Sequence, residues 1–238
     1  MKPALQPIAD RGPVLLVVAA PVEARAALHA FKRDPGEGDA EWTLIALSER
    51  LEMVVSGVGK AAAAAATARF ADPARHGAVL SIGVAGALPA SGLEIGAVAL
   101  AERSVFADEG FQTPAGFTDI ASAGFPPGPE GGMGAKADEA VVDLLRPLAG
   151  AAGVIATVST CSGTDALASE IARRTGAIAE AMEGGAVGVT AQRLSRDADR
   201  PLWFSELRVV SNTTGDRDRQ EWDLRGACRV LGDLVARL

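Results

Sequence analysis

The chain has 238 residues, of which 48% are hydrophobic and 4% aromatic, and it contains no tyrosine. This length can bury a full core in one large α/β domain or two small ones, packed mainly from Ala, Val and Leu. The formal net charge of −7, with no local cluster of Lys or Arg to offset it, argues against a nucleic-acid-binding surface.

Metal, disulfide and membrane functions find little support in the sequence. Cys161 and Cys228 are too few and too far apart for a disulfide framework or a zinc site, and His29 and His76 lack ligand spacing. The apolar stretches are strand-sized or alanine-rich, and residues 1–13 lack the apolar region of a signal peptide. We therefore expect a soluble, cytoplasmic protein with no metal and no membrane segment.

Strand-length apolar runs alternate with helical patterns along the chain. Residues 1–13 contain three prolines and no apolar period, so we expect a flexible N-terminal arm before a domain at residues 14–238. The expected strands are Val14–Ala20, Thr43–Leu47, Leu51–Ser56, Val79–Ile82, Ile95–Ala101, Val154–Ser159, Ala177–Met182 and Leu202–Ser211. The expected helices are residues 22–32, 60–70, 141–148, 166–175, 184–194 and 222–238. This alternation predicts a single α/β domain with a parallel or mixed sheet.

Two segments are expected to be loops. Gly83–Gly86 is glycine-rich and separates two expected strands. Ala107–Gly134 is rich in Gly and Pro, has no period, and is too long for an inert connection. We interpret it as a functional loop, either a lid or a subunit contact.

The segment Gly57–Ala62 follows an expected strand, opens a helix, and mimics the dinucleotide-binding pattern G-x-G-x-x-A. That pattern also requires an acid at the end of the next strand, and Ser81–Val84 contains none. NAD binding is therefore disfavoured, although the glycines and the free N–H groups of the helix start still allow close approach to a ligand.

Three polar side chains follow the ends of expected strands, where open α/β sheets bind ligands. Glu23 is either a carboxylate that complements a helix dipole or a group in the crevice, and Glu183 has the same placement. If both converge there, they could act as general bases. Asn212 and Ser211 precede a charged loop and form either an Asx turn or a ligand contact.

The ordered set of such segments resembles the nucleosidase and nucleoside phosphorylase family. The segments are 19–23, 56–60, 81–86, 181–183 and 208–212, and the resemblance covers about residues 14–238. It implies a three-layer αβα sandwich around a central mixed sheet. The tail 212–219 with Trp222 is most similar to the futalosine-hydrolysing branch of this family, which acts in the futalosine pathway of menaquinone biosynthesis.

The resemblance also implies roles for single residues. Glu23 would orient or deprotonate a water near C1′, Glu183 would bind the ribose hydroxyls, and Asn212 would bind the purine N7 and 6-substituent. The implied substrate-binding residues are Val58, Gly83, Val84, Ala85, Gly86, Met182 and Ser211. No metal or organic cofactor is implied, and the expected partners are a small nucleoside and further copies of the chain in a homo-oligomer.

Asn212 differs from the Asp that this family uses to cleave adenine nucleosides. An amide NH₂ can donate to N7 or to a 6-oxo group but cannot supply a proton. A mismatched base would leave a buried polar group unpaired, at a cost of roughly 1–3 kcal/mol. A 6-oxopurine such as the hypoxanthine of futalosine is therefore expected.

The expected reaction is hydrolysis of the N-glycosidic bond of futalosine, with release of hypoxanthine and dehypoxanthine futalosine. A phosphorylase, a methylthioadenosine-type nucleosidase and a non-catalytic binding module remain alternatives, although Glu23 would repel an anionic nucleophile and Arg25 is expected to point elsewhere. Asp216 is a reserve candidate for a proton donor. Arg103, Arg217 and Arg219 are candidates for the substrate aryl carboxylate. Phe111, Phe117 and Trp222 are candidates for stacking on the purine.

Overall fold

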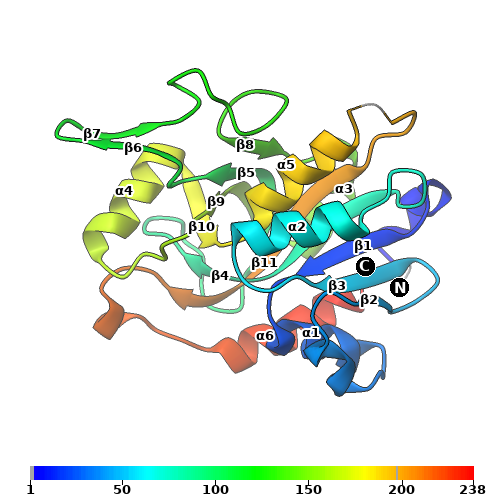
Figure 1. Cartoon of the computed structure of the whole chain (residues 1–238). Helices are drawn as coiled ribbons and strands as arrows, with labels where there is room; N and C mark the ends of the chain where they lie inside the picture. The colour runs from blue at the N-terminus through cyan, green and yellow to red at the C-terminus, as the bar shows by residue number, and fades with distance from the viewer. Residues whose placement is uncertain (1–2, 197) are drawn as a thin grey trace.

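The computed structural model describes residues 3–196 and 198–238 and contains a mixed sheet between two layers of helices (Figure 1). The strands are β1 (Val14–Val18), β2 (Leu44–Ala46), β3 (Leu51–Val55), β4 (Ala78–Ala87), β5 (Val98–Phe106), β6 (Gly110–Thr113), β7 (Gly116–Asp119), β8 (Gly134–Lys136), β9 (Ala151–Thr157), β10 (Ala177–Ala181) and β11 (Trp203–Thr213). The helices are α1 (Pro21–Ala30), α2 (Lys60–Phe70), α3 (Glu139–Leu145), α4 (Asp165–Thr175), α5 (Gly184–Leu194) and α6 (Leu224–Val235).

The side chains of β1 show why the sheet is covered on both faces. Leu16 and Val18 face a core that includes residues of α1, α3 and α6, whereas Leu15 and Val17 face a second core that includes residues of α2 and α5. Successive residues of a strand point to opposite faces, so a continuous apolar run such as β1 requires cover on both. The expected single-domain three-layer sandwich is confirmed.

The strand order is β10-β9-β5-β11-β4-β1-β3-β2, with β8 paired to β5. Strand β10 pairs with β9 on one side and, in antiparallel fashion, with β4 on the other. Five strands therefore close into a ring: β10, β9, β5, β11 and β4. Within it, Gly86 of β4 is the register partner of both Glu180 and Asn212.

Two expectations about loops are wrong. Residues 83–86 belong to β4, because that strand continues to pair with β11 and β10 and its backbone groups are satisfied there. The segment 107–134 contains the hairpin β6–β7, which projects from the body at the upper left of Figure 1, and reaches the start of β8.

The expectation of a flexible N-terminal arm is also wrong for residues 3–11. Residues Gln6–Arg11 form a 3₁₀ helix, and Leu5 and Ile8 are buried in the same core as α6. The backbone N–H of Ala4 donates to the carbonyl of Arg237 at 2.8 Å. Met1 and Lys2 lie outside the described residues. The helices 60–70 and 184–194 have the expected bounds. None of the helices in the described ranges combines the length and apolarity needed to cross a membrane.

Candidate active site

A cavity of about 530 Å³ lies around the last residues of β1, β4, β10 and β11. Its lining includes three carboxylates, Glu23, Glu180 and Glu183, together with Asn212. Of the expected substrate-binding residues, those in the lining are Val58, Val84, Ala85, Gly86, Met182 and Ser211. The sheet therefore brings together most of the groups that the sequence placed far apart. Among the described residues, no group of three or more His, Cys, Asp or Glu is arranged to hold a metal.

Glu23 lies in the first turn of α1, and two backbone N–H groups fix its carboxylate. Its Oε2 accepts from the N–H of Ala20 at 2.9 Å and its Oε1 from the N–H of Val84 at 2.8 Å, and the residue is 4% exposed. Burial raises the pKa of Glu23, while the positive charge of Arg208 and the two N–H donors oppose that rise. The carboxylate is thus held in one orientation at the edge of the cavity.

Glu183 immediately precedes α5 and is held from two sides. Its Oε1 accepts from the N–H of Gly59 at 3.0 Å, and its Oε2 lies 3.3 Å from Nη2 of Arg208. Gly59 belongs to the sequence that mimics a dinucleotide-binding motif. Its amide, at the start of α2, therefore binds a carboxylate of the chain itself, in place of a ligand phosphate.

Arg208, which the sequence analysis missed, joins these carboxylates from within the fold. It is 1% exposed, donates from Nε to Glu206 Oε1 at 2.7 Å, and donates from Nη2 to Ser81 Oγ at 2.8 Å. Burial lowers the pKa of this guanidinium, but Glu206, Glu183 and Glu23 raise it overall above its ordinary value. Glu206 and Arg208, at positions i and i+2 of β11, share one face of the strand, and this spacing of opposite charges between apolar residues was the available signal for a buried ion pair.

Two glycines make room for this network. A Cβ at Gly83 would overlap Glu23 Oε1 and lie 2.7 Å from Arg208 Nη1, and a Cβ at Gly184 would overlap the carboxylate of Glu206. Gly83 is not part of the cavity lining, so its expected role in substrate contact is not supported. These two glycines therefore allow charged side chains of the protein to come close to the backbone.

Asn212 has one donor left for a ligand. Its Nδ2 donates to the carbonyl of Thr213 at 2.9 Å, and its Oδ1 accepts from the hydroxyl of Ser211 at 2.8 Å. An amide nitrogen carries two hydrogens, and the second has no partner among these contacts. Because the side chain lines the cavity, that N–H is available to an acceptor there.

A second group missed by the sequence analysis is Glu180, which lies on β10 three residues before Glu183. It is 5% exposed and accepts two hydrogen bonds from Ser162, from the backbone N–H at 2.8 Å and from the hydroxyl at 2.6 Å. Burial raises the pKa of Glu180, and the two Ser162 donors oppose that rise. A charged residue in a short, otherwise apolar strand was again the signal.

The charged loop after β11 contains three candidate residues, Asp216, Arg217 and Arg219, and one of them lies in the cavity lining. Arg217 lines the cavity, and its guanidinium lies 4.8 Å from the centre of the Trp222 ring. Arg219 is paired with Asp165 and Asp216 outside the lining. The N–H of Asp165, followed by Arg219, lowers the pKa of Asp216, which suits an anchor of this loop better than a proton donor.

The remaining candidates lie elsewhere. Arg103 is exposed on β5 and is absent from the lining. Phe111 is exposed on β6, and Phe117 packs against Arg174. Trp222, which is half exposed, is thus the one of the three aromatic candidates that lines the cavity.

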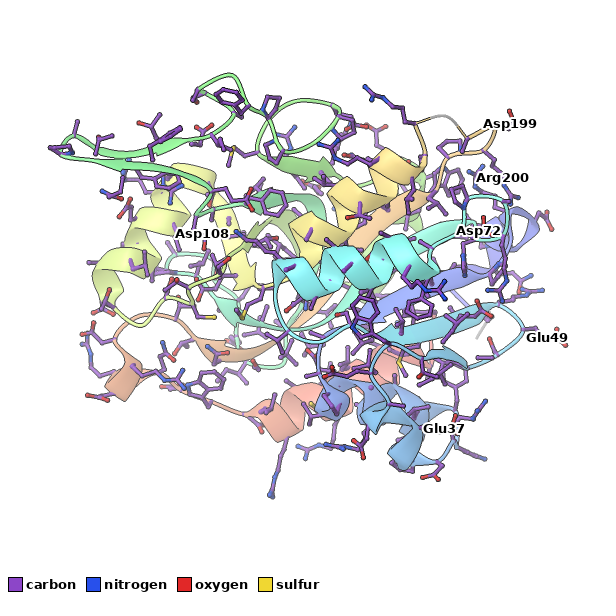
Figure 2. The ribbon with its side chains drawn as sticks, in the orientation of Figure 1. Glu37, Glu49, Asp72, Asp108, Asp199 and Arg200 are labelled. Atoms are coloured by element: carbon purple, nitrogen blue, oxygen red, sulfur yellow. The ribbon has the colours of Figure 1, made fainter. Side chains whose placement is uncertain are left out.

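Two basic side chains close in sequence to lining residues, Lys60 and Arg25, are paired with acids of the chain. Lys60, the first residue of α2, is paired with Asp108 and lies 3.3 Å from Glu109. Asp108, which is labelled in Figure 2, also accepts from the N–H of Ser159 at 2.5 Å. Arg25 is paired with Asp39 at the surface, as expected for a residue that points away from the crevice.

Comparison with known proteins agrees with this geometry. The model of the phosphorylase superfamily matches residues 14–238. A futalosine hydrolase of Acidothermus cellulolyticus is 38% identical over 193 residues, covering 79% of this chain and 74% of that protein. A futalosine hydrolase of Streptomyces coelicolor is 34% identical over 238 residues, covering 94% of each.

Solved structures share the fold at lower identity. A Helicobacter pylori 5′-methylthioadenosine/S-adenosylhomocysteine nucleosidase with butyl-thio-DADMe-Immucillin-A has a TM-score of 0.71 at 18% identity, covering 94% of this chain and 96% of that chain. A futalosine hydrolase mutant of the same organism has a TM-score of 0.69 at 18% identity with the same coverage. The chain therefore belongs to the phosphorylase superfamily and, within it, to the family of the futalosine hydrolases.

Proposed function

We propose that this protein hydrolyses the N-glycosidic bond of futalosine and releases hypoxanthine and dehypoxanthine futalosine, a step of the futalosine pathway of menaquinone biosynthesis. The observation that carries the proposal is the pair of fixed carboxylates, Glu23 and Glu183, in one cavity with a free amide donor on Asn212. Similarity to two futalosine hydrolases, over 79% and 94% of this chain, supports the same substrate.

Glu23 would act on the attacking water, and Glu183 would act on the ribose. Bond cleavage gives positive charge to the sugar, and a water must then attack C1′. Glu23 orients that water and accepts its proton, which fits a carboxylate whose pKa burial raises. Glu183 binds the ribose hydroxyls and fixes C1′ in line with the water.

Asn212 would assist departure of the base. As the glycosidic bond breaks, negative charge develops on the purine, and the second N–H of Asn212 donates to N7 or to the 6-oxo oxygen. Both of these atoms are acceptors in hypoxanthine. A bond from Asn212 to the 6-oxo oxygen favours a 6-oxopurine, because the 6-amino group of adenine would present a donor at that position.

The charges of the cavity favour water over phosphate as the nucleophile. Three carboxylates line it, and Arg208 is already shared among Glu23, Glu183 and Glu206. A phosphate anion beside the sugar would be repelled by Glu23, and Arg208, whose positive charge acts on Glu23, is already engaged by carboxylates of the chain. This argument separates the hydrolase from the phosphorylase alternative.

The far end of futalosine carries an aryl carboxylate. Arg217 is the arginine in the described lining, and together with the ring of Trp222 it offers a cation and an apolar surface. We assign the aryl carboxylate to Arg217 for this reason. Arg219 serves as the comparison residue for Arg217, because two aspartates already engage it.

We also propose a homo-oligomer and a cytoplasmic location. The exposed apolar side chains Val22, Val58, Trp222 and Leu224 line the cavity, and a neighbouring subunit would shield them from water. Both cysteines are free thiols, as is usual in a reducing compartment.

The test is to incubate the purified protein with futalosine, inosine and methylthioadenosine, with and without phosphate, and to follow free base by chromatography. Hypoxanthine release from futalosine without phosphate, with little adenine from methylthioadenosine, is the expected result. Dependence on phosphate would assign the protein to the phosphorylases. No release from any substrate would support a binding module.

A further inference from the structure

Asp108 joins three segments that are far apart in the chain, and the proposed reaction leaves it without a role. One carboxylate oxygen, Oδ1, pairs with Lys60, the first residue of α2. The other, Oδ2, accepts from the backbone N–H groups of Ser159 and Thr160, at 2.5 and 3.3 Å, just after β9. Asp108 itself lies between β5 and β6, where the segment 107–134 leaves the body of the protein (Figure 1).

The loop that Asp108 holds forms one wall of the cavity. We call residues 159–163 the wall loop, and its lining residues are Cys161, Ser162 and Gly163. The far part of the loop is anchored because Ser162 donates two hydrogen bonds to Glu180. The near part is anchored because Asp108 accepts from two consecutive N–H groups. The middle of the wall loop therefore lies between two carboxylates that fix its position.

Contacts on both sides hold Asp108 in place. The N–H of Ala107 donates to the carbonyl of Thr157 at 3.0 Å, next to the paired strands β5 and β9. Lys60, whose side chain is 14% exposed, balances the charge of Asp108 and also lies 3.3 Å from Glu109. Hydrogen bonds to an ionised acceptor are stronger than those between neutral groups, so a carboxylate suits the two N–H groups of the wall loop.

The start of α2 connects the wall loop to the ribose site. Gly59, the N-cap residue of α2, donates its N–H to Glu183 at 3.0 Å. Lys60, the next residue, pairs with Asp108. One short segment thus contacts the carboxylate assigned to the ribose and also the carboxylate that holds the opposite wall.

We propose that Asp108 is a positioning residue whose carboxylate, held by Lys60, sets the place of the wall loop and thereby the affinity of the cavity for its nucleoside. The inference rests on the proposed function for the identity of that nucleoside. Asp108 acts through the lining residues and does not touch the substrate. Glu23 and Asn212 are held by contacts to other segments, so the chemical step should change little when Asp108 is replaced.

The test compares the wild-type protein with Asp108→Ala, which removes the acceptor for two N–H groups of the wall loop. The measurements are KM and kcat for futalosine, Kd for hypoxanthine by calorimetry, and amide hydrogen exchange by mass spectrometry. We expect KM and Kd to rise by about tenfold, because hydrogen bonds to a charged group are lost. We expect kcat to change by less than about threefold. Exchange in residues 158–165 should become about tenfold faster while exchange in α6 stays the same.

Asp119→Ala is the matched control. Asp119 lies on β7, outside the cavity lining, and accepts from the N–H and the hydroxyl of Ser122, both at 2.7 Å. It makes the same kind of contact in the same segment, so its replacement should leave KM, Kd and exchange of the wall loop unchanged. If Asp108→Ala does not fold, Asp108→Asn takes its place. Asn keeps an oxygen for the wall loop but cannot pair with Lys60, and it should shift all three measurements in the same direction by less.

Unchanged KM and Kd in Asp108→Ala, or unchanged exchange of the wall loop, would overturn the inference. A fall in kcat without a rise in KM would overturn it as well, because Asp108 would then act on the chemical step. Futalosine cleavage by the wild-type protein is assayed on the same sample. An inactive wild-type protein would refute the proposed function, whereas a higher Kd and faster exchange in Asp108→Ala would still support the role of Asp108.

Discussion

Replacement of Arg208 by Met tests whether this residue holds the charged centre of the site together. The guanidinium is 1% exposed and neutralises Glu206 and Glu183 through contacts at 2.7 and 3.3 Å. Breaking a buried ion pair by removing one partner costs about 3–5 kcal/mol, because the other charge stays buried. For a chain of this size, that corresponds to a Tm lower by about 6–20 °C.

The loss should depend on pH in a defined direction. Burial already raises the pKa of Glu23, and Arg208 opposes that rise, so the variant should raise it further. A carboxyl with a raised folded-state pKa binds protons that the unfolded chain has released, and its penalty is fully present only above that pKa. The Tm difference from wild type should therefore be larger at about pH 8 than at about pH 5.5.

Thermal unfolding followed by circular dichroism at both pH values measures this difference. The matched control is Arg146→Met, which removes an exposed arginine 3.0 Å from Glu102. A surface pair contributes little, so this variant should lose about 3 °C or less. A similarly small loss for Arg208→Met, or the same loss at both pH values, would refute the account of the buried network.

Three further predictions concern the cavity. Glu23→Gln should slow futalosine hydrolysis by about 10²–10⁴-fold while hypoxanthine still binds, measured by chromatography and calorimetry, and near-normal turnover would exclude Glu23 as the base. Asn212→Asp should shift the ratio of kcat/KM for hypoxanthine and adenine nucleosides toward adenine by about tenfold or more, and an unchanged ratio would contradict its role. Arg217→Ala should raise KM for futalosine by about tenfold but not KM for inosine, which lacks the aryl carboxylate. Arg219→Ala is its control and should change neither KM.

The sequence predicts the layers of this fold well because the apolar patterns that define them are local. The continuous run at Val14–Val18 and the helices 60–70 and 184–194 follow from pattern and propensity alone. The assignment of Gly83–Gly86 failed because glycine indicates a loop only when no neighbouring strand satisfies its backbone. Here β10 and β11 do so, and that pairing joins segments far apart in the chain.

The site was predicted in part for the same reason. Glu23 and Glu183 follow strand ends, and Asn212 lies next to the last residue of β11, so these positions can be read from the sequence. Arg208 and Glu180 lie inside strands, where the role of a charged residue depends on the groups that it contacts. Those partners come from other strands and loops, so no local pattern identifies them.

The ring of β10, β9, β5, β11 and β4 ties the geometry of the cavity to the stability of the whole protein. A site carried by loops can loosen through local opening while the fold persists, but main-chain hydrogen bonds on both sides of Gly86 fix the separation of Glu180 and Asn212. Loop motion therefore has little effect on this separation, and a substitution that weakens the ring should change the cavity and lower stability together.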